Sequence, residues 1–444
     1  MRIFKKFQKV VLSIMAGLAL AASVPVGAVM AAPAATSSSQ LNTTNKQQQS
    51  LKLNVKATMA IDEQTGQILY QQNANQPVPV ASLSKLLTLY IVLSEIQAGK
   101  LSWNEKITPD KDSAQISQDT SLSNVPLRTD KQYTVKSLYE ATLIYSANGA
   151  AMALARKVAG SQEKFVQMMR KQAKQMGIDD AEIYTCNGLT NGQMKNAAYP
   201  GADKNAENKF SAKDMAIISM KLLQKYPEVI KTASVKDMKF DNGNGQTDMK
   251  NWNWMLPGGS SSYKLLPVDG LKTGTSDAAG ACFVGTTNKD GHRIVTVVLG
   301  AQHKNQTDNS RFVQTQKLMS YIYHTYDYVT LKAGEEKAEL PVYHGKEEKI
   351  KVESAKSVGL WLKKGKTAKD ITVKTSMDKD LTKKDALEAP LKDDQKVGQM
   401  ELKVNHESIE TITSSALKLP AQTTTSMKKA NIFQVMWRKI TSIF

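Results

Sequence analysis

A serine and a lysine three residues apart open the first helical segment of the chain. Ser82 and Lys85 stand in VASLSKLLT, residues 80–88. Residues three apart share one face of a helix, so the hydroxyl and the amine can meet. A serine hydroxyl becomes a strong nucleophile when a base takes its proton, and a lysine can be that base when burial and neighbouring cations lower its pKa. The pair alone is weak evidence, because other SxxK pairs, such as Ser161–Lys164, occur in the chain.

Two further motifs strengthen this interpretation. IYSANGAAMALA places Ser146 and Asn148 two apart, ahead of a run of small residues with helical character. VDGLKTGTS places Lys272, Thr273 and Gly274 on a predicted strand, and KTG occurs once in the chain. The order SxxK, SxN, KTG is the motif set of penicillin-binding proteins and class A β-lactamases. The three motifs together therefore predict acyl transfer through a serine, and no histidine base is needed.

The elements that must position these motifs alternate between strands and helices. ATMAIDEQTGQILYQQ predicts two short strands around a turn at Gly66, and two longer strands flank Lys289-Asp290-Gly291. Apolar residues at helical spacing predict helices over Ser84–Gln97, Val135–Ala159, Gln162–Met176, Ala212–Tyr226 and Arg311–Tyr326. Strands at both ends of this segment and helices between them predict one α/β (α+β) catalytic domain, residues 54–326, whose sheet uses both chain ends.

The chain changes character after this domain. Residues 327–418 hold short alternating runs separated by charged turns, such as EKIKVES and GQMELKVN, which predict a small β-sandwich with a spacer or docking role. Residues 419–444 predict a linker and an amphipathic helix. Its apolar arc and basic residues fit a helix lying on an anionic membrane surface, and a helix that faces a protein core is the alternative. The arc consists of Ile432, Phe433, Met436, Trp437, Ile440, Ile443 and Phe444.

The N-terminus predicts export. Basic residues, an apolar run over residues 10–26 and small-residue cleavage sites identify residues 1–34 as a signal peptide, with a transmembrane anchor as the alternative. Residues 35–53 predict a polar linker. The formal net charge is +18, and eight basic residues lie at the two ends, which leaves about 10 for the body. Export makes nucleic acid a poor partner for this charge, whereas an anionic cell envelope fits it.

Cysteine and histidine usage argues against other classes of site. Cys186 and Cys282 are the two cysteines of the chain, which is too few for a disulfide scaffold, and two separate buried thiols are expected. The five histidines are scattered without metal-ligand spacing. No metal or organic cofactor is therefore implied.

With these motifs in place, the sequence resembles the low-molecular-mass penicillin-binding proteins, which are serine-type D-alanyl-D-alanine carboxypeptidases. GLKTGTSDAAG and FSAKDMAII are similar to sequences of that family, and the segments of the chain follow the family's order along nearly its whole length. The resemblance implies a β-lactamase/transpeptidase-like fold, with a five-stranded antiparallel sheet between helical layers. It also implies removal of the terminal D-alanine from peptidoglycan pentapeptides, and β-lactams as covalent inhibitors.

The resemblance also implies a role for each motif residue. Ser82 would be the nucleophile, Lys85 its base, and Ser146 the group that passes a proton to the leaving nitrogen. The backbone N–H groups of Ser82 and Thr275 would form the oxyanion hole. A second set would bind the substrate peptide and its terminal carboxylate, and Lys272 would also lower the pKa of Lys85. This set comprises Asn148, Lys272, Thr273, Gly274, Thr275 and Arg311. Some family members carry histidine at the position of Thr275, which leaves the deacylation rate open.

Three other functions compete with the carboxypeptidase. A class A β-lactamase would add a glutamate in an ExxLN-type pattern, which the nearest candidate, Glu182, lacks. A peptidoglycan endopeptidase or transpeptidase shares the acyl-serine chemistry and differs in pocket shape. A non-catalytic wall-binding scaffold is disfavoured by the intact motifs. The expected location is the outer face of the cytoplasmic membrane, and the envelope features favour a Gram-positive cell.

Overall fold

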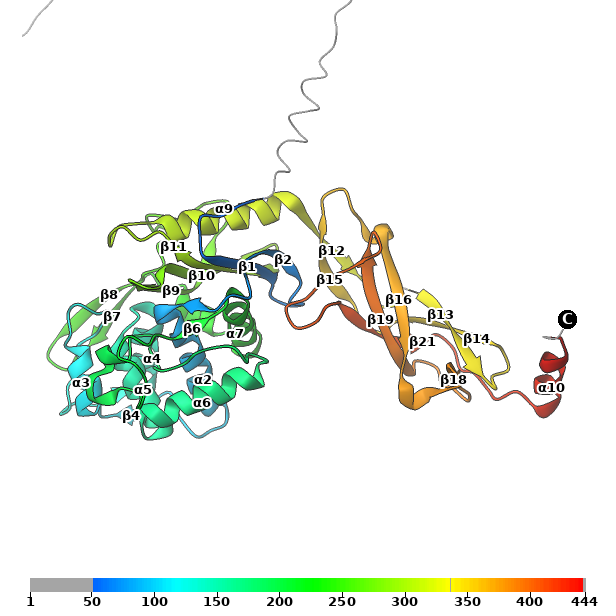
Figure 1. The fold of residues 1–444 in the computed structure, drawn as a ribbon, viewed down its shortest axis with the longest axis horizontal. Helices are drawn as coiled ribbons and strands as arrows, with labels where there is room; N and C mark the ends of the chain where they lie inside the picture. Colours follow the sequence, from blue (N-terminus) through cyan, green and yellow to red (C-terminus); the bar gives the residue numbers. More distant parts are fainter. Residues whose placement is uncertain (1–50, 336, 442–444) are drawn as a thin grey trace, which may run out of the picture. The chain divides into compact units, whose positions relative to one another are not determined.

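The computed structural model describes residues 51–335 and 337–441 (Figure 1). The predicted signal peptide and residues 35–50 of the predicted linker lie outside the described residues. The predicted boundary between linker and catalytic domain at residue 54 was too late, because Leu51 and Leu53 pack on the catalytic domain. Leu53 is only 2% exposed in an apolar cluster there, and its N–H donates to Oε1 of Gln72 at 3.1 Å.

A five-stranded sheet forms the centre of the catalytic domain. Its neighbouring strands pair antiparallel throughout, as predicted, and strands from both ends of the domain meet in it. Gly66, at φ +70°, makes the turn between the first two strands. The strand order across the sheet is β2 (Ile68–Gln72), β1 (Ala57–Asp62), β11 (His292–Ala301), β10 (Gly280–Lys289) and β9 (Val268–Ser276).

Helices cover both faces of this sheet (Figure 1). Along β10, Phe283 points to one face and packs on Phe312 of α9, whereas Val284 belongs to the larger core on the other face. This alternation is the period-two pattern of a strand that is buried on both sides. One face carries α9 (Ser310–Thr325). The other face carries α2 (Lys85–Gln97), α4 (Val135–Ile144), α5 (Asn148–Ala159), α6 (Gln162–Gln175), α7 (Ala212–Lys225) and α8 (Val229–Ala233).

The helix predicted over Val135–Ala159 is two helices, so that prediction was wrong. The chain breaks between α4 and α5 at Ser146, which adopts φ +62°. The N–H of Asn148 does not continue the helical pattern and donates to the carbonyl of Ser123 at 3.0 Å. The N–H of Ala147 donates back to the carbonyl of Ala141 at 3.0 Å, so a local turn ends α4 despite the helical propensity of the surrounding alanines and leucines. The break makes a sharp turn at the SxN motif.

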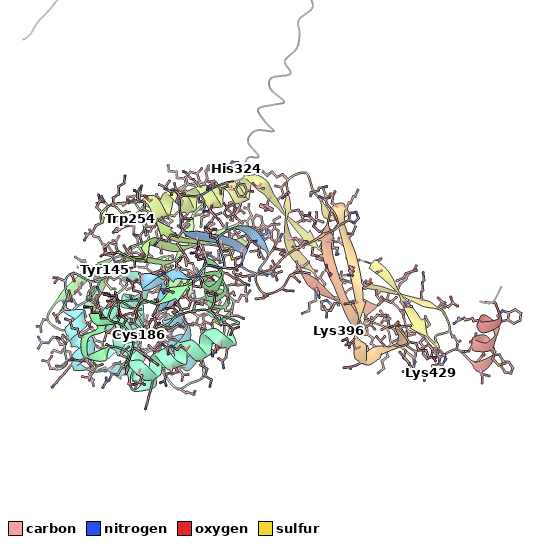
Figure 2. All side chains as sticks on the ribbon, viewed as in Figure 1. Tyr145, Cys186, Trp254, His324, Lys396 and Lys429 are labelled. Atoms are coloured by element: carbon pink, nitrogen blue, oxygen red, sulfur yellow. The ribbon has the colours of Figure 1, made fainter. Side chains whose placement is uncertain are left out.

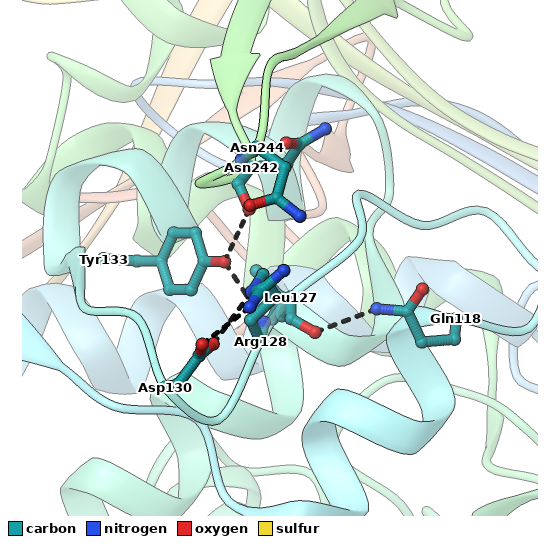
Figure 3. Close-up of polar contacts among 7 residues, drawn as sticks. All are labelled: Gln118, Leu127, Arg128, Asp130, Tyr133, Asn242 and Asn244. Atoms are coloured by element: carbon teal, nitrogen blue, oxygen red, sulfur yellow. Dashed lines mark hydrogen bonds and ion pairs between the residues drawn. The ribbon is translucent and has the colours of Figure 1, made fainter.

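Shorter elements border the helical layer. The hairpin of β7 (Asp237–Asp241) and β8 (Gln246–Lys250) is tied to the loop after α3 (Lys111–Ser117). The hydroxyl of Tyr133 donates to the carbonyl of Asn242 at 3.0 Å and accepts from the N–H of Arg128 at 3.1 Å (Figure 3). The remaining pairs are β3 (Val78–Pro79) with β6 (Lys209–Phe210) and β4 (Lys106–Ile107) with β5 (Tyr133–Thr134).

The β-rich domain contains the strands that the alternating runs predicted. A two-stranded ladder pairs β12 (Tyr326–Leu331) with β15 (Val358–Lys363). An eight-stranded sheet contains β13 (Lys337–Tyr343), β14 (Lys349–Ser354), β16 (Ile371–Met377), β17 (Thr382–Lys383), β18 (Ala386–Glu388), β19 (Lys396–Val404), β20 (Glu407–Ser408) and β21 (Lys418–Thr423). Leu360 of the ladder and Leu402 of the sheet share one apolar cluster, so the two sheets pack together here.

The predicted linker start at residue 419 was too early. Strand β21 pairs with β19 and β14 inside the sheet, and its Leu419 and Ala421 are buried. Pro420 lies opposite Gln399 in this strand. The β-rich domain therefore extends past residue 418.

Direct hydrogen bonds join the two domains. The side chain of Gln67 donates to the carbonyl of Trp361 at 2.7 Å and accepts from its N–H at 2.9 Å. The indole N–H of Trp361 donates to Oδ2 of Asp62 at 2.9 Å. All three residues are buried, so these bonds fix the catalytic domain against β15.

The last described element is α10 (Ile432–Thr441). Ile432, Phe433, Met436 and Trp437 are 58–78% exposed, so their side chains do not face a core formed by the described residues. Within residues 51–335 and 337–441, none of the helices has the length and apolar character needed to cross a membrane.

Candidate active site

The nucleophile candidate Ser82 lies in a short 3-10 turn, η1 (Ala81–Ser84), that leads directly into α2. Two glycines let neighbouring backbone approach this turn. A Cβ on Gly188 would lie 1.9 Å from the carbonyl oxygen of Ala81, and a Cβ on Gly274 would lie 2.5 Å from that of Val80. Strand β9 and the 186–189 loop therefore enclose the turn from two sides.

Lys85 is held by three hydrogen bonds in a fully buried position. Its Nζ lies 2.8 Å from Oγ of Ser82, 2.8 Å from Oδ1 of Asn148 and 2.7 Å from the carbonyl oxygen of Asn187. Burial lowers the pKa of Lys85 from an ordinary 10.5 to about 7, and the interaction with Cys186 opposes this shift weakly. A neutral amine has two N–H donors and one lone pair. The two amide oxygens can take the donors, which leaves the lone pair for the hydroxyl of Ser82.

The SxN motif borders the same cleft. The break between α4 and α5 places Ser146 there with an exposed fraction of 4%. Asn148 is fixed from both sides, because its Oδ1 accepts from Lys85 and its Nδ2 donates to the carbonyl of Ser123 at 3.1 Å. The side chain of Asn148 therefore has little freedom to move when a substrate binds.

The KTG strand and α9 bring two more cations to the site. Lys272 is 2% exposed, and its Nζ donates to the carbonyl of Thr273 at 2.8 Å. Arg311 is 7% exposed and donates to the carbonyl of Gly274 at 2.8 Å and to Oγ1 of Thr275 at 2.7 Å. The sequence prediction for Arg311 rested on a loose match, and the structure places this residue beside the KTG strand.

Buried positive charge is the main electrostatic feature of the site. Burial, with the charges of Lys85 and Arg311, lowers the pKa of Lys272 well below its ordinary value. Burial also lowers the pKa of Arg311. In the described part of the chain, none of the basic side chains Lys85, Lys272 and Arg311 has a carboxylate partner within 4.0 Å. An anionic group that enters the cleft would be attracted by them, and it would favour the charged form of Lys272.

A cleft with a volume of about 260 Å³ connects these groups. Seven of the nine predicted site residues line it, and Lys85 and Lys272 lie directly beneath them. The predicted lining residues are Ser82, Ser146, Asn148, Thr273, Gly274, Thr275 and Arg311. The structure therefore gathers all nine residues at one place, and their individual roles stay predictions.

Sequence reasoning missed several other groups at this cleft. The carbonyls of Ser123 and Asn187 position Asn148 and Lys85, and a backbone contact of this kind has no side-chain signature. Trp252, Trp254 and His303 also line the cleft. Isolated aromatic residues usually belong to a core, so the sequence offered no signal for them.

Two further expectations can be compared with the structure. Glu182 lies outside the cleft and pairs with Lys209 at 3.0 Å, so it does not occupy the position of a deacylating glutamate. Cys186 and Cys282 are separate buried thiols, as expected, and burial raises their pKa values to about 12 and about 11. Among the described residues, no group of three or more histidine, cysteine, aspartate or glutamate residues could hold a metal ion.

The fold and the site together define a serine-type peptidase of the penicillin-binding class. Residues 42–303 match the family model of D-alanyl-D-alanine carboxypeptidase, peptidase family S11. Residues 327–429 match the model of the penicillin-binding protein 5 C-terminal domain, which also extends past residue 418. The chain therefore belongs to the serine-type D-alanyl-D-alanine carboxypeptidases, the low-molecular-mass penicillin-binding proteins.

Similar proteins are known from several bacteria. D-alanyl-D-alanine carboxypeptidase DacF of Bacillus subtilis is 28% identical over 86% of this chain and 88% of its own length. DacC of Escherichia coli is 29% identical over 81% of this chain and 82% of its own. Among solved structures, a peptidoglycan synthesis regulatory factor (PBP3) from Streptococcus pneumoniae is 33% identical, with a TM-score of 0.70 over 85% of this chain and 100% of its own. Penicillin binding protein 5 from Haemophilus influenzae is 25% identical, with a TM-score of 0.67 over 86% of this chain and 99% of its own.

Proposed function

We propose that this carboxypeptidase removes the terminal D-alanine of peptidoglycan stem pentapeptides through an acyl intermediate on Ser82. The observation that carries the proposal is the contact between Nζ of Lys85 and Oγ of Ser82 at 2.8 Å, in a position where burial lowers the pKa of the lysine to about 7. Near neutral pH, a large fraction of this lysine is neutral and able to accept a proton.

The acylation step follows from this geometry. Oγ of Ser82 attacks the carbonyl carbon of the penultimate D-alanine while Lys85 takes the hydroxyl proton. The negative charge on the carbonyl oxygen meets the backbone N–H groups of Ser82 and Thr275. The C–N bond then breaks, and the proton taken by Lys85 reaches the leaving nitrogen through the hydroxyl of Ser146. Water then attacks the acyl-serine: its hydroxyl group joins the acyl carbon, and its proton returns to Oγ of Ser82, which yields the shortened peptide and the free enzyme.

The substrate-binding groups fit a peptide that ends in a carboxylate. Arg311 already donates to Thr275, so a terminal carboxylate can bind to both side chains at once. Thr273 and Lys272 supply further donors on the same strand, and Gly274 leaves room for the peptide to lie along the edge of β9. Asn148 lies across the cleft and can bond the peptide backbone. A β-lactam carries a carboxylate and a reactive carbonyl, so we expect it to acylate Ser82 as well.

A matched pair of proteins tests this function. Purified protein without residues 1–35 and 432–444 should release free D-alanine from a diacyl-Lys-D-Ala-D-Ala peptide. Ser82→Ala should abolish the release, because the nucleophile is lost. Release at the wild-type rate by Ser82→Ala would show that another group is the nucleophile. No release by the wild type would instead favour an endopeptidase, a β-lactamase or a scaffold.

We further propose that the protein is exported and lies at the outer face of the cytoplasmic membrane. Two features support attachment by α10. Its apolar residues Ile432, Phe433 and Met436 are exposed, and Lys428 and Lys429 precede it. A helix with this distribution binds an anionic bilayer surface through apolar burial and charge attraction.

Vesicle flotation tests the membrane attachment with two variants that add the same charge. Phe433→Glu places a carboxylate on the apolar arc, and Gln434→Glu places one on the polar face. The protein without residues 1–34 should float with vesicles that contain anionic lipid. Phe433→Glu should lose most of this binding, and Gln434→Glu should keep most of it. Equal binding by the two variants would contradict insertion of the apolar arc.

A further inference from the structure

Two tryptophans line the cleft without a role in the mechanism above. Trp252 and Trp254 lie in the segment between β8 and β9, on either side of the buried Asn253. Asn251 fixes this segment, because its Nδ2 donates to the carbonyls of Ala233 and Val235 at 3.1 and 2.8 Å. Both indoles are partly exposed. The segment therefore presents two ordered aromatic side chains to the site.

Trp252 reaches the side of the cleft that holds the SxN motif. Its indole N–H donates to the carbonyl of Tyr145 at 3.1 Å, and the two rings stack with centroids 6.2 Å apart. Tyr145 immediately precedes Ser146, the proposed donor to the leaving nitrogen. Trp252 is thus fixed beside the position of that nitrogen.

Trp254 reaches the side of the cleft that holds the carboxylate-binding groups. Its ring lies 5.4 Å from the ring of Phe312, measured between centroids, and Phe312 immediately follows Arg311. Figure 2 labels Tyr145 and Trp254 on the same part of the catalytic domain. The two tryptophans form an aromatic wall that runs from the neighbour of Ser146 to the neighbour of Arg311, and Phe312, which is only 2% exposed, supports Trp254.

The position of the substrate places one residue against this wall. In the proposed function, on which this inference rests, the terminal carboxylate lies at Arg311 and the scissile nitrogen lies near Ser146. The Cα of the terminal D-amino acid lies between these two groups. Among the residues that line the cleft, Asp308 is the one with an acidic side chain. Its carboxylate already accepts hydrogen bonds from the backbone N–H groups of Ser310 and Lys304, at 2.8 and 2.9 Å.

We propose that the aromatic wall of Trp252 and Trp254 is the subsite for the side chain of the terminal D-amino acid, and that it lets the enzyme release apolar D-amino acids larger than D-alanine. Contact with an indole removes apolar side-chain surface from water, and each additional buried methylene is expected to favour binding by a factor of about four. A carboxylate side chain at the same place would lose hydration near the carboxylate of Asp308, while the terminal carboxylate of the peptide would already occupy Arg311.

A series of peptides that differ only in the terminal residue tests this subsite. The peptides are diacyl-Lys-D-Ala-X, where X is glycine, D-alanine, D-leucine or D-aspartate. The measured quantity is kcat/KM per active site, with active sites counted by a fluorescent penicillin. The wild type should release D-leucine with a kcat/KM at least equal to that for D-alanine. The value for glycine should be about fourfold lower than for D-alanine, and D-aspartate should be the poorest substrate.

Substitutions separate a subsite role from a structural one. Trp254→Ala should lower the D-leucine to glycine ratio of kcat/KM about tenfold, and Trp254→Phe should restore most of it. Trp103→Ala is the matched control, because Trp103 packs on Tyr139 and does not line the cleft. A ratio that stays the same in Trp254→Ala overturns the proposal. The proposal is also overturned if Trp254→Ala changes the preference for the residue at the lysine position of the peptide and leaves the preference for X unchanged.

The same data separate this inference from the proposed function. If the wild type releases neither D-alanine nor glycine, the carboxypeptidase function itself fails. If it releases D-alanine and discriminates strongly against D-leucine, the wall excludes larger residues, and only the further inference fails.

Discussion

The pH dependence of acylation gives the most quantitative test of the proposed base. The perturbation is a change of pH from 5 to 10, and the measured quantity is the second-order rate constant for acylation of Ser82 by a fluorescent penicillin. Burial lowers the pKa of Lys85 to about 7. The neutral amine is the reactive form, so the rate constant should rise with pH through this value and then level off.

The magnitude follows from the fraction of neutral lysine. With a pKa of about 7, roughly half of Lys85 is neutral at pH 7 and about 1% at pH 5, so acylation should fall about 50-fold between these values. From pH 7 to pH 9 the rate constant should rise only about twofold. A lysine with an ordinary pKa of 10.5 would instead gain about tenfold for each pH unit up to pH 10.

The assay needs two controls. Ser82→Ala should remain unlabelled at every pH, and circular dichroism should show that the fold is intact at pH 5. A rate constant that keeps rising to pH 10 would refute the lowered pKa. A rate constant that does not change between pH 5 and pH 7 would refute Lys85 as the base.

Three more substitutions have expected outcomes. Gly188→Ala should slow acylation of Ser82 at least about 100-fold, because the new Cβ would lie 1.9 Å from the carbonyl oxygen of Ala81. Gly160→Ala is the control, because Gly160 has a similar φ and open space around it, and it should acylate at the wild-type rate. Equal acylation rates for the two variants would contradict the close approach at Gly188. Arg311→Lys should raise KM at least about tenfold for peptides with a free terminal carboxylate and much less for their methyl esters. An equal rise in KM for both kinds of peptide would exclude Arg311 as the group that binds the carboxylate. Gln67→Ala should lower the free energy of unfolding by about 2 kcal/mol in denaturant, because two buried hydrogen bonds to Trp361 are lost; a change below about 0.5 kcal/mol would contradict it.

Much of the fold could be predicted because its periodic patterns match its packing. The helix predicted over Ser84–Gln97 forms as α2 (Lys85–Gln97), and its apolar residues from Leu86 to Leu93 are buried. The strands on either side of Lys289-Asp290-Gly291 form as β10 and β11. The three motifs also meet at one cleft. SxxK begins in the 3-10 turn that leads into α2, SxN spans the turn into α5, and KTG lies on the edge strand β9.

The failures have local physical causes. The break at Ser146 was missed because the helix ends in a local turn at a residue with positive φ, where the N–H of Ala147 donates back to the carbonyl of Ala141, and a serine at that position gives no clear stop signal. Strand β21 was assigned to a linker because the Thr-rich run QTTTS at its end is typical of irregular chain, and Pro420 is itself unusual inside a sheet. The proline is accommodated opposite Gln399 within the sheet. The contact of Lys85 with the carbonyl of Asn187 depends on backbone position, which no residue pattern encodes.

Peptide mapping of the acylated protein tests the central claim most directly. The protein without residues 1–34 would be treated with a penicillin, quenched in acid, digested and analysed by mass spectrometry. We expect one added penicillin per molecule, attached to Ser82, and no added mass in Ser82→Ala. An adduct on another residue, or an unmodified protein at saturating penicillin, would contradict the assignment of Ser82 as the nucleophile.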